Sequence, residues 1–306
     1  MFLTIFSWSL TRELRKALRV EYTEWNEMAH DWNMVQAASE CRVLIIRRLK
    51  GRSQGALQFA TSIWVLSSDR SVRLEQECEL SRNTSDIALI FIFTVDSGSD
   101  TIPYTGWGDI VKVSVRMNSC LKFHDTSPDD ESPECVQTRW TNYVFEQHAG
   151  STNFQSALVD RTLSLSVRTV RTTRVHDGIA GIMKENEHLC GSENLRVWMD
   201  QGTGEVFAMI HFKPQFRIGY MIFQLNSAVH PLLLMEEGHR NVKITGLDMP
   251  AEGRRSSHPR TSKKRSENEK SKSEKRTGSI RIEFATEDER DLFVQKYWSV
   301  GDVSVD

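Results

Sequence analysis

The chain has 306 residues, of which 39% are hydrophobic, so it is long enough to bury one large core or two ordinary ones. Its 39 lysines and arginines nearly balance 41 aspartates and glutamates, which excludes a polyelectrolyte. No apolar run approaches the roughly 20 residues that span a bilayer. The five cysteines are widely spaced, which fits neither a disulfide framework nor a metal site and favours a reducing, intracellular compartment.

The segment 1–60 predicts a helical extension. Mostly apolar side chains recur there at three- or four-residue steps, which is typical of an amphipathic helix. Its first half is basic and its second half acidic. The functional interpretation is a helix on an anionic membrane or an organelle presequence, and the alternative is a helix docked on the protein with a solvated outer face. The acidic half favours docking, because anionic lipid repels it. The recurring positions are Leu14, Leu18, Tyr22, Trp25, Ala29, Trp32 and Gln36.

From Ser62 onward the apolar residues alternate with polar ones, which indicates short antiparallel strands. The clearest strand covers 111–117, and similar strands are expected at 195–199, 206–212 and 216–224. Two helices interrupt the alternation. One covers Ser151 to Arg161, and the other begins after Thr286, a good N-cap residue followed by an acidic first turn.

Two of these strand–helix units match each other along the chain. Three apolar positions lie at steps of nine and then four, and the same steps recur near the C-terminus, which indicates an internal repeat. Strands closed at one end by a helix are typical of the pleckstrin-homology (PH) layout, in which the helix seals a small barrel. The positions are Phe145, Phe154 and Leu158, then Phe284, Phe293 and Tyr297.

The expected fold is therefore mainly β with capping helices (α+β), made of two tandem PH-like small barrels behind an N-terminal amphipathic helix. The predicted boundaries are 1–60 for the helical extension, 61–175 for the first module and 176–306 for the second module.

Five segments between about Asp109 and Val300 resemble uncharacterised proteins of filamentous ascomycete fungi that carry degenerate PH-like modules. The resemblance implies the same tandem fold and says nothing about activity. The segments are WTNYVFEQHAGSTNFQSALVDRTL, TVRTTRVHDGI, ENLRVWMDQGTGEVFAMIHF, FRIGYMIFQLN and IRIEFATEDERDLF.

No residue pattern in the chain favours catalysis or a metal site. The nine histidines are scattered, without the HExxH or clustered His/Cys spacing of metal sites. His176 precedes Asp177, but no nucleophile motif accompanies the pair. Cys190 has no basic neighbour to lower its pKa. We therefore expect a protein that is not an enzyme and that uses no metal or cofactor.

Arginines recur along the segment that follows the first predicted helix. If that segment is extended, Arg168 and Arg174 fall on one face and Arg171 on the other. Guanidinium groups in a row can bind phosphates or an acidic partner. Alternatively, charge keeps an edge strand soluble and unpaired, and this second interpretation is favoured.

Lys213 and Arg217 flank a turn in the second module, where PH domains that bind phosphoinositides place basic residues. Two cations are few for a headgroup with several phosphates, which usually needs more converging donors.

The insertion at 251–279 is the strongest compositional feature. Ten basic side chains against four glutamates give it a net charge of +6, and it has no aliphatic or aromatic side chain larger than alanine, so we expect a disordered basic loop. It is either a tolerated insertion or a surface for nucleic acid, membrane or a nuclear import receptor. The candidate residues are Arg254, Arg255, Lys263, Lys264, Arg265, Lys275 and Arg276.

Together these patterns predict a non-catalytic interaction or scaffold protein that binds another protein through PH-like modules. The alternative is a peripheral membrane adaptor that binds anionic lipid, such as a phosphoinositide, through basic residues. Sequence-specific nucleic-acid binding is disfavoured, because glutamates interrupt the basic loop and aromatic residues are absent from it. A cytoplasmic location is expected, with a nuclear one as the alternative through the loose bipartite signal in the loop.

Overall fold

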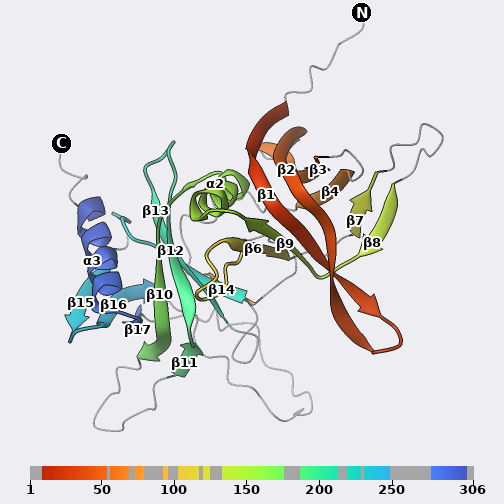
Figure 1. Cartoon of the computed structure of the whole chain (residues 1–306). Coiled ribbons are helices and arrows are strands. Elements are labelled where there is room, and N and C mark those ends of the chain that lie inside the picture. The colour runs from red at the N-terminus through yellow and green to blue at the C-terminus, as the bar shows by residue number, and fades with distance from the viewer. Residues whose placement is uncertain are drawn as a thin grey trace, which may run out of the picture.

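The computed structural model describes most of the chain as two antiparallel β-sheets and two helices (Figure 1). This confirms the expected mainly β fold with capping helices. The described residues are 9–53, 56–68, 73–78, 92–95, 103–116, 120–124, 133–175, 187–212, 219–228, 231–248 and 277–301.

The first sheet takes its eight strands from the first half of the chain. Helix α2 (His148–Val159) follows its strand β9 directly and closes one end of its core. In sheet order the strands are β6 (Lys112–Arg116), β9 (Trp140–Phe145), β1 (Ser9–Asn26), β2 (Asp31–Ser53), β3 (Ala56–Ser67), β4 (Arg73–Cys78), β7 (Cys120–Phe123) and β8 (Glu134–Gln137).

The second sheet includes one edge strand, β5, that comes from the first half of the sequence. Helix α3 (Glu287–Gly301) follows strand β17 and packs on the core of this sheet. In sheet order the strands are β15 (Leu233–Glu237), β16 (Asn241–Asp248), β17 (Thr277–Phe284), β10 (Thr162–Val175), β12 (Glu193–Met199), β13 (Val206–Phe212), β14 (Gly219–Gln224) and β5 (Ile92–Val95), while β11 (Glu187–Cys190) extends β12 along the edge of β10.

The predicted N-terminal helix is wrong, because residues 9–53 form the long hairpin of β1 and β2. Two register irregularities, between Leu14 and Ala17 and between Val20 and Glu21, break the strict alternation of a strand. The first irregularity puts its extra residue in β1, and the second puts it in β2. Against β9, Leu18 is also an extra residue of β1, so the buried Ala17 and Val20 lie three positions apart, which imitates a helical period. The segment is therefore part of the first sheet, and β10 opens the second sheet before the expected boundary at residue 175.

The predicted closed barrels are also wrong, since each sheet is an open path in the part of the chain that the structure describes. In the first sheet a bridge from Tyr104 to Ser114 occupies the outer side of β6, where β8 would have to join. In the second sheet β5 occupies the outer side of β14. Other segments thus cover the edges that barrel closure would need.

The internal repeat extends to the register of the two sheets. In both, the first strand of the unit pairs with the strand that precedes the helix, and one residue is skipped at the same place. In these pairs, each residue of β1 corresponds to a residue of β10 at one constant distance along the chain. Each residue of β9 corresponds to a residue of β17 at a second constant distance. The pairs are Ala17–Phe145, Arg19–Val144, Val20–Tyr143, Glu21–Asn142 and Tyr22–Thr141 in the first sheet, and Thr169–Phe284, Arg171–Glu283, Thr172–Ile282, Thr173–Arg281 and Arg174–Ile280 in the second.

Each helix packs a buried phenylalanine on the phenylalanine that ends the preceding strand. The ring centroids of Phe145 and Phe154 are 5.4 Å apart, and those of Phe284 and Phe293 are 5.5 Å apart. All four side chains are buried, each pair in the core of its own sheet. The repeated spacing therefore reflects a repeated packing contact, as expected from the sequence.

A buried arginine fixes the C-terminal end of α2. Arg47 of β2 is 4% exposed and donates hydrogen bonds to the carbonyl oxygens of Ala157 (2.7 Å) and Leu158 (3.3 Å). It also forms an ion pair with Asp160, which ends the helix in a left-handed conformation. A cation at this position satisfies free carbonyls and the negative end of the helix dipole.

The structure corrects one expectation about the cysteines. Cys120 of β7 and Cys135 of β8 form a disulfide between neighbouring strands, with Cα atoms 5.5 Å apart. The argument for a reducing compartment from cysteine spacing therefore loses its basis. Among the described residues, no helix is both long and apolar enough to cross a membrane.

Truncating Phe293 tests the packing of α3. We expect Phe293→Ala to lower the free energy of unfolding by about 3–5 kcal/mol, because the side chain is fully buried against Phe284. Leu292→Ala is the control: its side chain is 49% exposed, so the change should stay within about 0.5 kcal/mol. Urea unfolding measures both, and equal effects would contradict the packing described.

Candidate functional site

The second sheet presents two faces of different character. Its inner face carries the main apolar core under α3. On its outer face, strands β12 to β14 lie against the first half of the chain, where Trp198, Phe207 and Met209 form a small apolar cluster with Val159 of α2. The outer face of β10, β16 and β17 carries polar and charged side chains, and a pocket opens on it.

A fully buried arginine lies where the first half of the chain covers the outer face. Arg196 of β12 donates hydrogen bonds to the carbonyl of Pro103, to Oε1 of Gln155 (2.9 Å) and to Nδ1 of His211 (2.7 Å). The neighbouring Asn194 donates to the carbonyl oxygens of Thr105 and Gly106. This cluster therefore joins the second sheet to α2 and to the segment before β6.

Burial sets the protonation of these groups. It lowers the pKa of His211, and the charge of Arg196 lowers it further. Burial also lowers the pKa of Arg196 to about 10, although Glu193 and Tyr104 counteract it, and raises the pKa of Tyr104 to about 12 together with Glu193. At neutral pH the arginine is charged, the tyrosine is protonated and the histidine is neutral. None is poised to exchange a proton near neutrality, so the cluster is structural.

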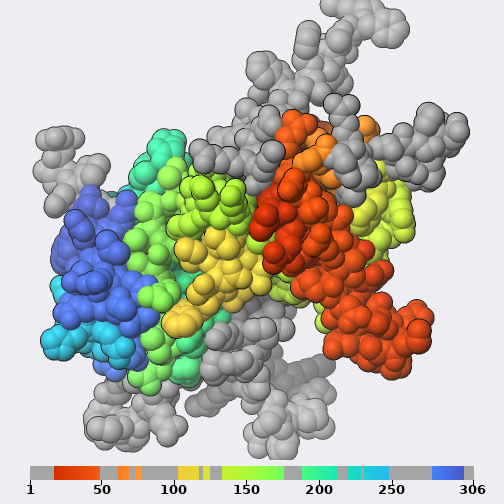
Figure 2. Space-filling model, in the orientation of Figure 1, coloured from red at the N-terminus to blue at the C-terminus, as the bar shows by residue number. Residues whose placement is uncertain are grey.

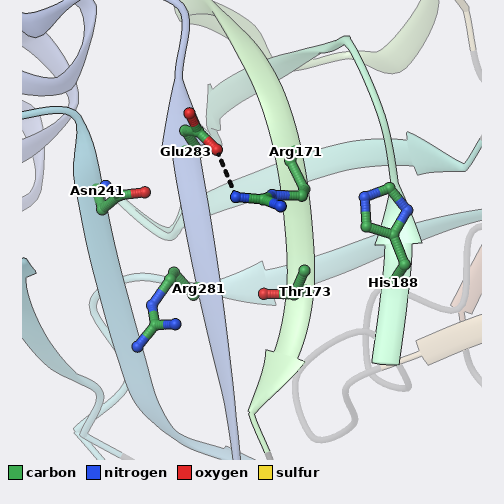
Figure 3. A pocket seen from close by; sticks show the side chains of 6 residues that line it. All are labelled: Arg171, Thr173, His188, Asn241, Arg281 and Glu283. Carbon is green, nitrogen blue, oxygen red and sulfur yellow. Dashed lines mark hydrogen bonds and ion pairs between the residues drawn. The ribbon is translucent and has the colours of Figure 1, made fainter. Parts of the chain in front are cut away.

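The exposed part of the outer face contains a pocket of about 200 Å³ (Figure 3). It is built by the sheet register, which sets Arg171 beside Glu283 and Thr173 beside both Arg281 and His188. Directly paired residues of antiparallel strands share a face, so these side chains converge without any loop. The lining residues are Arg171 and Thr173 of β10, His188 of β11, Asn241 of β16, and Arg281 and Glu283 of β17.

The charges in and around the pocket are mostly paired. Glu283 accepts hydrogen bonds from Arg171 (3.0 Å) and Arg240 (3.2 Å), and Glu237 accepts one from Arg281 (2.6 Å). Three arginines, and Lys243 directly opposite Arg281, outnumber these two glutamates, so positive charge is in excess. Exposed pairs of this kind contribute at most about 1 kcal/mol each and exchange partners readily. Little charge in the pocket is therefore left uncompensated for an anionic group.

The three candidate arginines of β10 lie in a central strand. Strands β17 and β12 flank β10, so the interpretation of an unpaired edge strand kept soluble by charge is wrong. The extra residue in β10 between Thr169 and Arg171 reverses the alternation, which puts Arg168 on the face of Arg171. Arg174 lies opposite Ile280 on the other face. Only Arg171 lines the pocket.

Arg168 holds helix α3 in place. Its backbone N–H and its Nε both donate to Oε1 of Glu289, at 3.0 and 2.8 Å. Burial raises the pKa of Glu289, but the hydrogen bonds from Arg168 and Thr286 outweigh it, so that the pKa lies below its ordinary value. The guanidinium also lies over the ring of Trp107. This arginine binds within its own chain.

The other candidate basic residues lie outside the described residues. These are Lys213 and Arg217 of the expected lipid site, and Arg254, Arg255, Lys263, Lys264, Arg265, Lys275 and Arg276 of the basic loop.

Among the described residues, no group of three or more His, Cys, Asp or Glu side chains could hold a metal ion. The thiol of Cys41 is buried, which raises its pKa to about 11 and leaves it protonated and unreactive. Cys190 is buried as well.

Sequence reasoning missed five of the six pocket residues. They come from four strands, and their convergence depends on register across β16, β17, β10 and β11. The alternation of Ile280 and Ile282 with Arg281 and Glu283 does indicate that the two charged residues share an outward face.

Comparisons of this chain with models of known protein families, with curated proteins and with solved structures find no match.

Acid should destabilise the protein through His211. The folded pKa lies below the ordinary value of 6.5, so below that pH the unfolded chain takes up a proton that the folded histidine resists. The free energy of unfolding should therefore fall between about pH 7 and pH 5. His211→Gln, which keeps an acceptor for Arg196, should flatten this slope in urea unfolding. His239→Gln is the control, because its side chain is 90% exposed; an equal flattening would contradict the assignment.

Proposed function

We propose that the chain is a non-catalytic interaction protein made of two PH-like modules, and that it binds an extended segment of a partner protein at β15. The observation that carries this proposal is an edge strand with exposed apolar side chains. Leu233 is 65% exposed and Met235 is 47% exposed. Among the described residues, β15 pairs only with β16, so its other edge has no strand beside it.

The PH-like assignment rests on the repeat. In each unit several antiparallel strands are followed by one helix, and the strand before the helix pairs with the first strand of the unit. The helix packs on the core through an aromatic side chain in both. The open sheets differ from a closed PH barrel, so the likeness lies in element order and packing.

The edge of β15 suits docking by strand addition. Backbone N–H and C=O groups at a free edge can bind an incoming strand, and the side chains beside it select the partner. Leu233 and Met235 share the outer face of the sheet, next to Thr245 and Lys243 of β16. A partner strand with apolar side chains at alternate positions fits such an edge, because it would cover both exposed residues.

Charge on the edge should abolish this binding. Peptides selected on the full chain from a displayed library of random peptides should bind the double variant Leu233→Lys, Met235→Lys about tenfold more weakly or worse. The matched control is Leu292→Lys on α3, where a similarly exposed leucine is replaced. Peptides that bind all three proteins equally would refute the assignment of the site.

Anionic lipid is the second candidate, and the pocket favours it because Arg171 and Arg281 open onto one exposed face. If lipid binds there, Arg171→Gln with Arg281→Gln should reduce co-sedimentation with phosphoinositide vesicles. If the basic loop is responsible, deletion of 253–276 should reduce it instead, with a steep salt dependence. Failure of the wild-type chain to sediment with these vesicles would remove the lipid candidate.

A further inference from the structure

The hairpin of β1 and β2 extends beyond the core of the first sheet (Figures 1 and 2). Val20 and Tyr22 of β1 and Ala38 of β2 belong to the buried core cluster, whereas residues 23–34 contribute nothing to it. The ladder nevertheless continues to the pair Asn26–Asp31. We call residues 23–34 the arm, and both figures show it projecting from the body of the molecule.

The arm carries large apolar side chains that no core requires. Met28 at the tip is 96% exposed, Met34 is 53% exposed and Trp25 is 44% exposed. Three of the ten exposed large hydrophobic side chains among the described residues thus lie within this one short stretch of chain. Trp25 and Trp32 are directly paired, so they share a face, and Met34 lies further along that face of the same strand.

Contacts at the base hold the arm in place. Thr23 exchanges hydrogen bonds with Thr138 and accepts others from the backbone of Arg139 and Trp140. The guanidinium of Arg139 lies 4.7 Å from the ring centroid of Trp32. Within the arm, the rings of Trp25 and Trp32 meet edge to face at 5.6 Å. These contacts account for the position of Trp32, but they leave Met28 and much of Trp25 in contact with solvent.

The side-chain charges within this stretch of chain are acidic, although one cation, Arg139, lies beside its base. From Val20 to Cys41 the chain has no lysine or arginine. Glu24, Glu27 and Asp31 are exposed near the tip, whereas Glu21 is paired with Arg19. Carboxylates that lie this close together favour a cationic partner. The acidic residues of this stretch are Glu21, Glu24, Glu27, Asp31 and Glu40.

We propose that the arm is a docking surface for a partner protein that presents a basic segment with apolar side chains. Tryptophan supplies a large rigid contact area, and methionine adapts to the shape of its partner. Charge complementarity selects this occupant, since the carboxylates that attract lysine and arginine are repelled by an anionic membrane. The arm and β15 lie at opposite sides of the molecule (Figure 1), so the two surfaces are independent.

The test measures the binding of defined peptides to the full chain by fluorescence anisotropy. The probe is a labelled peptide of alternating lysine and leucine, and its counterpart has glutamate in place of lysine. We expect the chain to bind the lysine peptide at least about tenfold more tightly than the glutamate peptide. Trp25→Ser with Met28→Ser should weaken that binding about tenfold or more.

A charge reversal keeps the test decisive if the first variant alters the hairpin. Glu24→Lys with Glu27→Lys retains the apolar side chains, and it should reverse the preference in favour of the glutamate peptide. Trp298→Ser on α3 is the control for the loss of an exposed tryptophan, which is 55% exposed there. It should bind like the wild type.

Three results would overturn the proposal. They are equal binding of both peptides, unchanged binding by the arm variants, and arm-dependent binding to anionic vesicles or self-association instead of peptide binding. The variant Leu233→Lys, Met235→Lys is measured in parallel and should keep most of the binding of the lysine peptide, because Lys243, directly opposite Met235, repels a cationic strand at β15. If only that variant loses binding, the peptide binds at β15, and the proposal that the arm is the docking surface is refuted. If the β15 proposal fails in its own test, the binding of the lysine peptide to the arm is still expected.

Discussion

The buried charge of Arg196 constrains the rest of the molecule. A guanidinium out of contact with water is very costly unless every side of it meets an acceptor or an opposite charge. Here Nη1 and Nη2 have acceptors in the carbonyl of Pro103, Gln155 of α2 and His211 of β13, whereas the buried Nε has no hydrogen-bond partner among the described residues. The two sheets therefore cannot separate without exposing or orphaning this charge. Whatever binds either half meets a pair of modules in a fixed arrangement.

That arrangement explains why the two faces of the second sheet differ. The apolar part of the outer face is covered by α2 and the segment before β6, so the pocket and β15 remain on the uncovered part. Helix α2 contacts the second sheet and also packs on the core of the first sheet. Gln155 and Val159 face the second sheet, while Phe154 and Leu158 pack inward. One helix thus seals one module and joins it to the other.

The two proposed docking surfaces differ in charge and lie far apart on this rigid pair. The edge at β15 adjoins a face with an excess of positive charge, and the charged residues of the arm itself are acidic. Two partners of different chemistry could then be held by one chain, which is how a scaffold acts. The repeat accounts for the two similar strand–helix units. The two proposed docking surfaces lie where the units differ from each other. Within the described residues, the long arm belongs to the first unit, and β15 is an edge of the second.

The sequence by itself determined the β-rich class, the two strand–helix units and the aromatic contacts, because alternation and fixed spacing are local properties of the chain. It could not determine register, since a single extra residue changes which face a side chain occupies. The extra residue at Leu18 made part of β1 resemble a helix, and the extra residue in β10 moved Arg168 to the face of Arg171. Nor could it reveal which edges are covered or which cysteines meet. Cys120 and Cys135, the residues of the pocket and the partners of Arg196 are brought together by pairing between distant strands, and only the tertiary structure decides that pairing.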